Sequence, residues 1–169
     1  DPQDHESNLG AVSSKNHFNK ILNYIKLAEK EGGKILFGGK ALKLSGRCKK
    51  GWFIEPTIIE GLNNNAKTNQ EEIFGPVVTL IPFDNEEDAI QIANESDYGL
   101  SATIWTEDKE RATRVSNQVE AGVIWVNCWL VRDLRTPFGG MKQSGMGREG
   151  GSEALRFFTE QKNVCTSIA

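Results

Sequence analysis

The stretch Glu71-Glu72-Ile73-Phe74-Gly75-Pro76 is followed at once by an apolar run, residues 77–83. A Gly-Pro step ends a helix and fixes the direction of the chain, so the run is predicted to be a strand. The two carboxylates and the ring are then held on a short, well-defined segment. A carboxylate there can accept hydrogen bonds from both hydroxyls of a ribose, and an aromatic ring can pack against a flat ligand. The alternative is a solvated turn with one buried phenylalanine, which the hexapeptide by itself favours.

Towards the carboxyl terminus, strand and helix patterns alternate. Residues 85–88 open a helix with negative charge at its amino end, where the helix dipole favours it. Strands are expected at 101–105 and 122–126, with a helix at 108–119 between them. This order predicts a sheet with parallel strands and crossover helices. The first of these helices is expected to bury Ala89, Ile90, Ile92 and Ala93.

Towards the amino terminus, Ser13 or Ser14 can cap a helix that runs to about Glu31 and ends at a Gly-Gly pair. Pro56 indicates that the extended segment 51–59 is an edge strand. The other expected segments are a strand at 34–37, an exposed basic loop at 38–50, a polar connection at 62–70, a Gly-rich segment at 138–151, a helix at 152–157 and a terminal strand at 162–168.

The composition is that of an ordinary globular protein, with 38% hydrophobic and 25% charged residues among 169. A net charge of -3 argues against nucleic acid as a partner, and no apolar stretch approaches the roughly 20 residues that cross a membrane. Three scattered cysteines and no secretion signal indicate a reducing compartment, the cytoplasm. The two histidines lie far apart, so no metal site is predicted. The chain does not begin with Met, and we do not expect Asp1 to be the natural first residue.

Two familiar motifs are rejected. Gly145-Met146-Gly147-Arg148-Glu149-Gly150 matches the dinucleotide fingerprint G-x-G-x-x-G, but no strand precedes it, as that fingerprint requires. Cys128 follows a buried strand, where a cysteine is more often a small core residue than a nucleophile. The chain therefore lacks a complete catalytic set.

The segment Trp129-Leu130-Val131-Arg132-Asp133-Leu134-Arg135 follows the end of a predicted strand, where α/β proteins place ligand sites. Arginine grips a carboxylate through two parallel hydrogen bonds. A surface cluster of Arg, Asp and Arg side chains is an equally good interpretation of these residues alone.

Together these segments resemble the C-terminal part of the aldehyde dehydrogenase superfamily, over essentially the whole chain. The segments that carry the resemblance, in the family's order, are Glu71–Pro76, Tyr98-Gly99-Leu100-Ser101-Ala102, Gly122-Val123-Ile124-Trp125-Val126-Asn127, Pro137-Phe138-Gly139-Gly140-Met141-Lys142-Gln143-Ser144-Gly145, Gly147-Arg148-Glu149 and Phe158-Thr159-Glu160. Residues 127–138 resemble the muconic semialdehyde dehydrogenases (2-aminomuconic and 2-hydroxymuconic) within it. The resemblance implies an α/β fold, with residues 1–157 as the C-terminal portion of the catalytic domain and 158–169 as an oligomerisation strand.

The resemblance also implies roles for individual residues. Glu72 would bind the nicotinamide ribose of NAD or NADP, with Phe74 beside it, while Lys20 and His17 occupy positions that contact the adenosine ribose. The aldehyde tunnel would be lined by Leu130, Arg132 and Phe138. Arg132 would bind the carboxylate of a semialdehyde, with Arg135 as the weaker candidate. Arg148 and Glu160 would tie the Gly-rich segment to the last strand, near a homodimer or tetramer interface.

The family's nucleophilic cysteine, general-base glutamate and dinucleotide-binding domain would all lie upstream of Asp1. Thiohemiacetal chemistry needs an activated thiolate and an oxyanion site. The resemblance therefore implies a portion of an enzyme that has no turnover alone. The alternative is a truncated, non-catalytic module that docks through its terminal strand.

Overall fold

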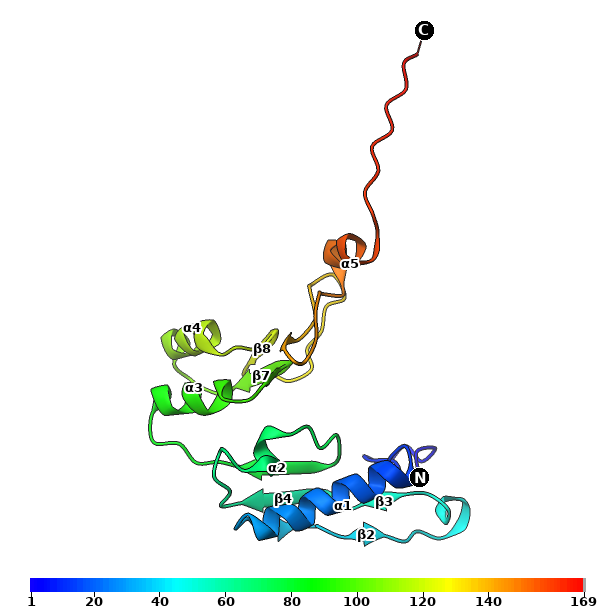
Figure 1. The fold of residues 1–169 in the computed structure, drawn as a ribbon, viewed down its shortest axis with the longest axis vertical. Helices are drawn as coiled ribbons and strands as arrows, with labels where there is room; N and C mark the ends of the chain where they lie inside the picture. The colour runs from blue at the N-terminus through cyan, green and yellow to red at the C-terminus, as the bar shows by residue number, and fades with distance from the viewer. Residues whose placement is uncertain (169) are drawn as a thin grey trace. The chain divides into compact units, whose positions relative to one another are not determined.

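The computed structural model describes residues 1–168, which divide into two compact units. Unit 1 is Asp1–Phe83, and unit 2 begins at Asp84. Figure 1 shows the course of the chain through both.

Unit 1 consists of one long helix packed on a small sheet. Its elements are α1 (Lys15–Lys30), β1 (Lys34–Phe37), β2 (Ala41–Leu42), the 3-10 turn η1 (Gly46–Cys48), β3 (Phe53–Ile54), β4 (Thr57–Glu60), α2 (Lys67–Gln70) and β5 (Val77–Leu80). The sheet order is β1-β4-β5, with β1 antiparallel and β5 parallel to β4. Strands β2 and β3 form a separate antiparallel pair.

Helix α1 forms where the sequence predicts it. Ser14 is the N-cap, and its side chain accepts a hydrogen bond from the backbone N–H of His17 at 3.2 Å. An apolar stripe of Ile21, Ile25 and Ala28 is buried on one face of the helix. That stripe packs against strand residues including Ile54 and Ile59, so the core lies between α1 and the sheet.

The edge-strand prediction for residues 51–59 is wrong for β4, which is the central strand of the three-stranded sheet, whereas β3 lies in a two-stranded pair with β2 and is an edge strand. Pro56 lies just before β4 rather than within it, so its missing N–H removes no hydrogen bond from the ladder. The polar connection and the basic loop also contain short elements, α2, β2 and η1, that the sequence did not reveal.

Unit 2 is built around one parallel strand pair. Its elements are α3 (Glu86–Asn94), β6 (Tyr98–Gly99), β7 (Ser101–Ile104), α4 (Lys109–Gln118), β8 (Val123–Val126), β9 (Met141–Lys142) and α5 (Gly151–Phe158). Strands β7 and β8 are parallel, with α4 as the crossover, as predicted. Strand β5 pairs with β4 and not with β7, so one continuous sheet through 77–83, 101–105 and 122–126 is not formed.

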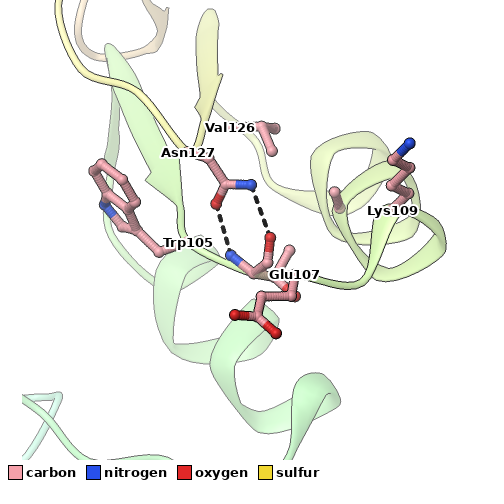
Figure 2. Close-up of a pocket in the computed structure, with 7 residues that line it drawn as sticks. Trp105, Glu107, Lys109, Val126 and Asn127 are labelled. Atoms are coloured by element: carbon pink, nitrogen blue, oxygen red, sulfur yellow. Dashed lines mark hydrogen bonds between the residues drawn. The ribbon is translucent and has the colours of Figure 1, made fainter.

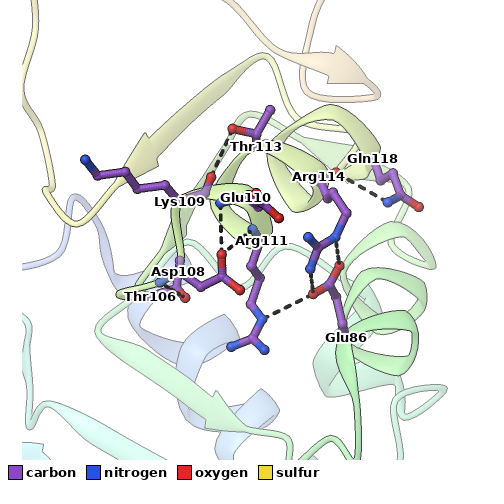
Figure 3. Close-up of polar contacts among 9 residues, drawn as sticks. All are labelled: Glu86, Thr106, Asp108, Lys109, Glu110, Arg111, Thr113, Arg114 and Gln118. Atoms are coloured by element: carbon purple, nitrogen blue, oxygen red, sulfur yellow. Dashed lines mark hydrogen bonds and ion pairs between the residues drawn. The ribbon is translucent and has the colours of Figure 1, made fainter.

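Ion pairs link helices α3 and α4 (Figure 3). The carboxylate of Glu86 accepts hydrogen bonds from Arg111 Nε at 3.2 Å and from Arg114 Nε and Nη2 at 3.0 and 2.9 Å. These hydrogen bonds, led by that of Arg114, hold the pKa of Glu86 below its ordinary value.

The burial expected for α3 is only partly present. Ala89, Ile90 and Ile92 are half-buried, and Ala93 is exposed. The helix that packs against α3 is α4, and one neighbouring helix covers only part of an apolar stripe.

The carboxyl-terminal end begins with the predicted helix, α5. The terminal strand expected at 162–168 is absent, since residues 159–168 form no helix and pair with no strand in the described chain. A strand is defined by pairing with a neighbour, and this segment pairs with none among residues 1–168.

Candidate functional site

The segment Glu71–Pro76 rests on α1. The Lys20 ammonium donates a hydrogen bond to the backbone carbonyl oxygen of Glu72 at 2.6 Å. A Cβ added at Gly75 would lie 2.6 Å from Ile21 Cδ1, so only glycine allows this close approach. Lys20 therefore holds the segment in place, a different contact from the ribose contact implied by resemblance.

Glu71 forms a second tie between the segment and its surroundings. The Tyr24 hydroxyl donates to Glu71 Oε2, and Lys67 Nζ lies 3.2 Å from Glu71 Oε1. The Tyr24 hydrogen bond is the main reason that the pKa of Glu71 is below its ordinary value. The sequence-based interpretation missed Tyr24 and Lys67, although Tyr24 lies one turn after Lys20 on the same helix face.

Glu72 and Phe74 are left available to a ligand. The Glu72 side chain is exposed and has no hydrogen-bond or ion-pair partner among residues 1–168. Phe74 is 72% exposed and has a left-handed backbone, with φ of 60°. That conformation is uncommon outside glycine, and it presents the ring instead of burying it.

A pocket of about 560 Å³ lies beside this ring. His17 lines it too, and the His17 and Phe74 ring centroids are 6.2 Å apart. The Nδ1 atom of His17 lies 3.2 Å from Ser13 Oγ, while its Nε2 atom is buried with no hydrogen-bond partner among the described residues. The remaining lining is mostly apolar: Leu9, Gly10, Ala11, Val12, Ser13, Ile54, Gly75 and Pro76. Unit 1 thus brings all four predicted cofactor residues to one region.

In unit 2, Arg132 lies over an aromatic ring. Its Cζ is 4.1 Å from the centroid of Phe138, and its Nη2 donates to Glu149 Oε1 at 2.6 Å. Stacking on a ring leaves the edge of a guanidinium free for hydrogen bonds. Two of the predicted substrate residues, Arg132 and Phe138, are therefore in contact.

The other two predicted substrate residues are placed differently. Leu130 is exposed, with φ of 56°, on a loop that Trp125 holds by donating from Nε1 to the Val131 carbonyl at 2.8 Å. Arg135 binds Asp133 through Nε and Nη2, which holds the pKa of the Asp133 carboxyl below its usual range. Arg135 thus forms the surface pair that was the alternative interpretation.

The predicted pair of Arg148 and Glu160 is not formed in this chain. Arg148 Nη1 donates to the carbonyls of Gly140 and Gly147 at 2.9 and 2.7 Å, and so fastens the Gly-rich segment to itself. Glu160 lies in the exposed segment after α5. The predicted tie between the Gly-rich segment and the last strand through Arg148 and Glu160, near a subunit interface, stays a prediction.

A further pocket, of about 490 Å³, lies where β7 and β8 end (Figure 2). The Asn127 side chain accepts from the Thr106 N–H at 2.9 Å and donates to the Thr106 carbonyl at 2.8 Å. This double hydrogen bond clamps the two strand ends together. Trp105 forms one wall, and Lys109 and Glu107 also line the pocket.

A search for other kinds of site gives little. Among residues 1–168, no group of three or more His, Cys, Asp or Glu side chains could hold a metal ion. The only cysteine side-chain hydrogen bond within that range is a long one from Cys165 to Asn163. No helix in the described part of the chain is long and apolar enough to span a membrane.

Comparison with known proteins gives a consistent result. The model of the aldehyde dehydrogenase family matches residues 1–164. The chain is 48% identical over 167 residues to the 2-hydroxymuconic semialdehyde dehydrogenase of Pseudomonas sp. (strain CF600), covering 99% of the chain and 34% of that enzyme. It is 49% identical over 165 residues to the 2-aminomuconic semialdehyde dehydrogenase of Danio rerio, covering 96% and 34%.

Solved structures agree. An indole-3-acetaldehyde dehydrogenase in complex with NAD+ superimposes with a TM-score of 0.89 at 40% identity, covering 95% of this chain and 32% of that one. The NAD+ complex of an aldehyde dehydrogenase from Bacillus cereus superimposes with a TM-score of 0.86 at 41% identity, covering 93% of this chain and 31% of that one. The chain spans about a third of the length of the curated relatives it matches.

Proposed function

Because the chain belongs to the aldehyde dehydrogenase family, we propose that it is the C-terminal portion of an NAD(P)-dependent enzyme that oxidises a carboxylate-bearing semialdehyde to the acid. Unit 1 binds the nicotinamide ribose through Glu72 and Phe74. Unit 2 binds the substrate carboxylate through Arg132, with Leu130 and Phe138 along the chain of the aldehyde. The segment after α5, which pairs with no strand among residues 1–168, becomes an oligomerisation strand when it pairs with the sheet of a partner subunit; Phe158, which the prediction for 158–169 included, belongs to α5.

The exposed, unpaired Glu72 carboxylate, two residues before the exposed Phe74 ring, is the observation that carries the cofactor assignment. A ribose presents two neighbouring hydroxyls, and one carboxylate has two oxygens with which to accept both hydrogen bonds. The exposed ring offers an apolar face on the same short segment, and the segment is already fixed to α1 by Lys20. Little ordering is therefore required when the ribose binds.

The Arg132 guanidinium carries the substrate assignment. Its contact with the Phe138 ring restrains the side chain before a ligand arrives, and its donors match a carboxylate. The named relatives act on muconic semialdehydes, which agrees with this chemistry.

The cofactor assignment is tested by NAD binding. We expect the purified chain to bind NAD weakly, as measured by saturation-transfer NMR, and Glu72→Gln to weaken binding about ten-fold, because a hydrogen bond to a charged group contributes roughly 1.5–3 kcal/mol. Glu87→Gln removes an exposed carboxylate at the start of α3 and is the matched control. Equal binding by Glu72→Gln and the wild type would contradict the assignment.

We further propose that the 169-residue chain has no dehydrogenase activity by itself, because the only hydrogen bond of a thiol among residues 1–168 goes from Cys165 to an asparagine and not to a base. The measurement is NADH formation from a semialdehyde by the purified chain. A rate above that of a heat-inactivated sample would refute the proposal.

The exposed segment after α5 favours a second candidate function. In it, the chain is a non-catalytic module that docks by pairing this segment with a strand of a partner. Val164 and Ile168 are 74% and 95% exposed there. Defined dimers of the 18.7 kDa chain that neither bind NAD nor turn over aldehyde would favour this function over the first.

A further inference from the structure

Phe138 and Glu149 form an isolated antiparallel bridge in unit 2. The N–H of Phe138 donates to the Glu149 carbonyl at 2.7 Å, and the reverse hydrogen bond is 2.8 Å. Residues directly opposite in such a bridge have their side chains on the same face. The backbone therefore presents one ring and one carboxylate together, and Arg132 contacts both.

The Glu149 carboxylate occupies only part of the Arg132 guanidinium. The one hydrogen bond between them joins Nη2 and Oε1 at 2.6 Å. A guanidinium can hold a carboxylate through two parallel hydrogen bonds, which is the stronger arrangement. Arg135 already has that arrangement with Asp133, since both Nε and Nη2 are engaged. Of the two arginines, Arg132 therefore has the weaker ion pair within the chain.

We infer that Glu149 is a displaceable internal carboxylate, which competes with the carboxylate of the substrate for Arg132 and is released when the substrate binds. This rests on the proposed function, in which Arg132 binds a semialdehyde carboxylate. Glu149 is then a specificity-determining residue: a neutral aldehyde cannot replace it, whereas a charged ligand can.

The exposure of the pair makes displacement possible. The side chains of Arg132 and Glu149 are 45% and 57% exposed. Exposed ion pairs are weak, so the internal carboxylate lowers ligand affinity only about two- to five-fold. The Phe138 ring contacts the central carbon of the guanidinium, with Cζ 4.1 Å from its centroid, whereas Glu149 contacts Nη2, so the ring contact does not depend on which carboxylate is bound.

The experiment uses the 169-residue chain with sorbate, a six-carbon conjugated carboxylate, as the probe. NMR follows the Arg132 Nε–Hε signal and the carboxyl carbon of Glu149 during the titration. Glu149→Gln removes the competing charge while keeping the shape of the side chain, Glu149→Asp is the conservative variant, and Arg132→Met removes the binding group. The neutral alcohol 2,4-hexadien-1-ol is the uncharged control ligand.

We expect sorbate to shift the Glu149 carboxyl carbon in the wild type, and to bind Glu149→Gln about two- to five-fold more tightly. Arg132→Met should lose sorbate binding, and the alcohol should leave the Glu149 signal unchanged. The wild-type measurement remains decisive if a variant does not fold.

Two other outcomes are distinguishable. In the first, sorbate shifts the Arg132 Nε–Hε signal but not the Glu149 carboxyl carbon signal, or binds Glu149→Gln no more tightly than the wild type. Either result overturns the competition between the two carboxylates and leaves the proposed role of Arg132 intact. A titration in which sorbate shifts neither signal overturns the carboxylate-binding role of Arg132, and the competition with it.

Discussion

Three glycines bring backbone segments of unit 2 unusually close. The N–H of Gly122 donates to the Gly99 carbonyl at 3.0 Å, and a Cβ at Gly122 would lie 1.7 Å from the Gly139 carbonyl oxygen. A Cβ at Gly99 would lie 2.3 Å from the Glu120 carbonyl oxygen. These positions lie within the motifs that carry the family resemblance. Glycine is required there for a steric reason, because a side chain would separate β8 from the segment that follows Phe138.

We predict that Gly122→Ala destabilises unit 2 by about 2 kcal/mol or more, because backbone atoms cannot rotate out of the way as side-chain atoms can. Urea unfolding followed by tryptophan fluorescence measures the loss. The control is Gly10→Ala, whose Cβ would meet no atom closer than 3.9 Å. A Gly122→Ala midpoint within error of the wild type would show that the approach relaxes at little cost.

Two predicted ligand residues also have strained backbones. Phe74 and Leu130 have φ of 60° and 56°, and both side chains are exposed. A large side chain in the left-handed region costs of the order of 1–3 kcal/mol, which the surrounding structure must supply. The contacts of Lys20 and Trp125 with the adjoining backbone serve this purpose.

At the scale of elements, α1 organises unit 1 by its ends as well as by its apolar stripe. Glu31, the C-cap of α1, accepts hydrogen bonds from the backbone N–H groups of Lys67 and Thr68 at 2.7 and 3.1 Å. It also accepts from the buried Thr68 hydroxyl at 2.6 Å. Because the N-cap of α2, Ala66, has no side-chain acceptor, Glu31 caps this helix from another element.

This cap makes stability depend on pH. Burial by itself would raise the pKa of Glu31, but the hydrogen bonds from Thr68 and Lys67 hold it below its ordinary value of 4.5. A carboxyl with a lowered folded-state pKa contributes stability above the unfolded-state value, and this contribution is lost as the pH falls through the folded-state value. We therefore expect the urea concentration at the unfolding midpoint of the wild type to decrease as the pH is lowered below about 4.5.

Glu31→Gln should have a lower midpoint at neutral pH and a smaller further loss on acidification. Glu29→Gln, on the same helix, is the control for a general charge effect. Parallel pH curves for Glu31→Gln and the wild type would contradict the prediction.

At the scale of the molecule, the segment after α5 is extended but has no pairing partner among residues 1–168. Residues 159–168 pair with no strand in the described chain, although their apolar side chains are exposed. An extended segment with free backbone groups pairs readily with the edge of another sheet.

We expect the full chain to associate, and a chain that ends at Glu160 to have the mass of one chain, as measured by light scattering. Met146→Ser is the control, because it removes an apolar side chain that is 92% exposed outside this segment. If the shortened chain keeps the mass of the full one, the association surface lies elsewhere.

Local signals in the sequence determined helices α1, α3, α4 and α5 and the strand pair β7–β8, and they suggested the candidate residues, but they did not reveal α2. Ser14, Asn85 and Asp108 are caps because short polar side chains satisfy free N–H groups at helix starts, which depends on neighbouring residues alone. The family, too, followed from motifs read in order along the chain.

Only the tertiary structure decided which strands pair and which side chains meet. The central place of β4, the ties of Lys20 and Tyr24 to residues 71–72, and the contact of Arg132 with Glu149 all join residues far apart in the sequence. Periodicity shows which face of an element is buried, but it does not show against what, because pairing depends on the packing of the whole unit. For the same reason, the sequence predicted Arg132 as a carboxylate ligand but could not show that a carboxylate of the chain, that of Glu149, already binds it.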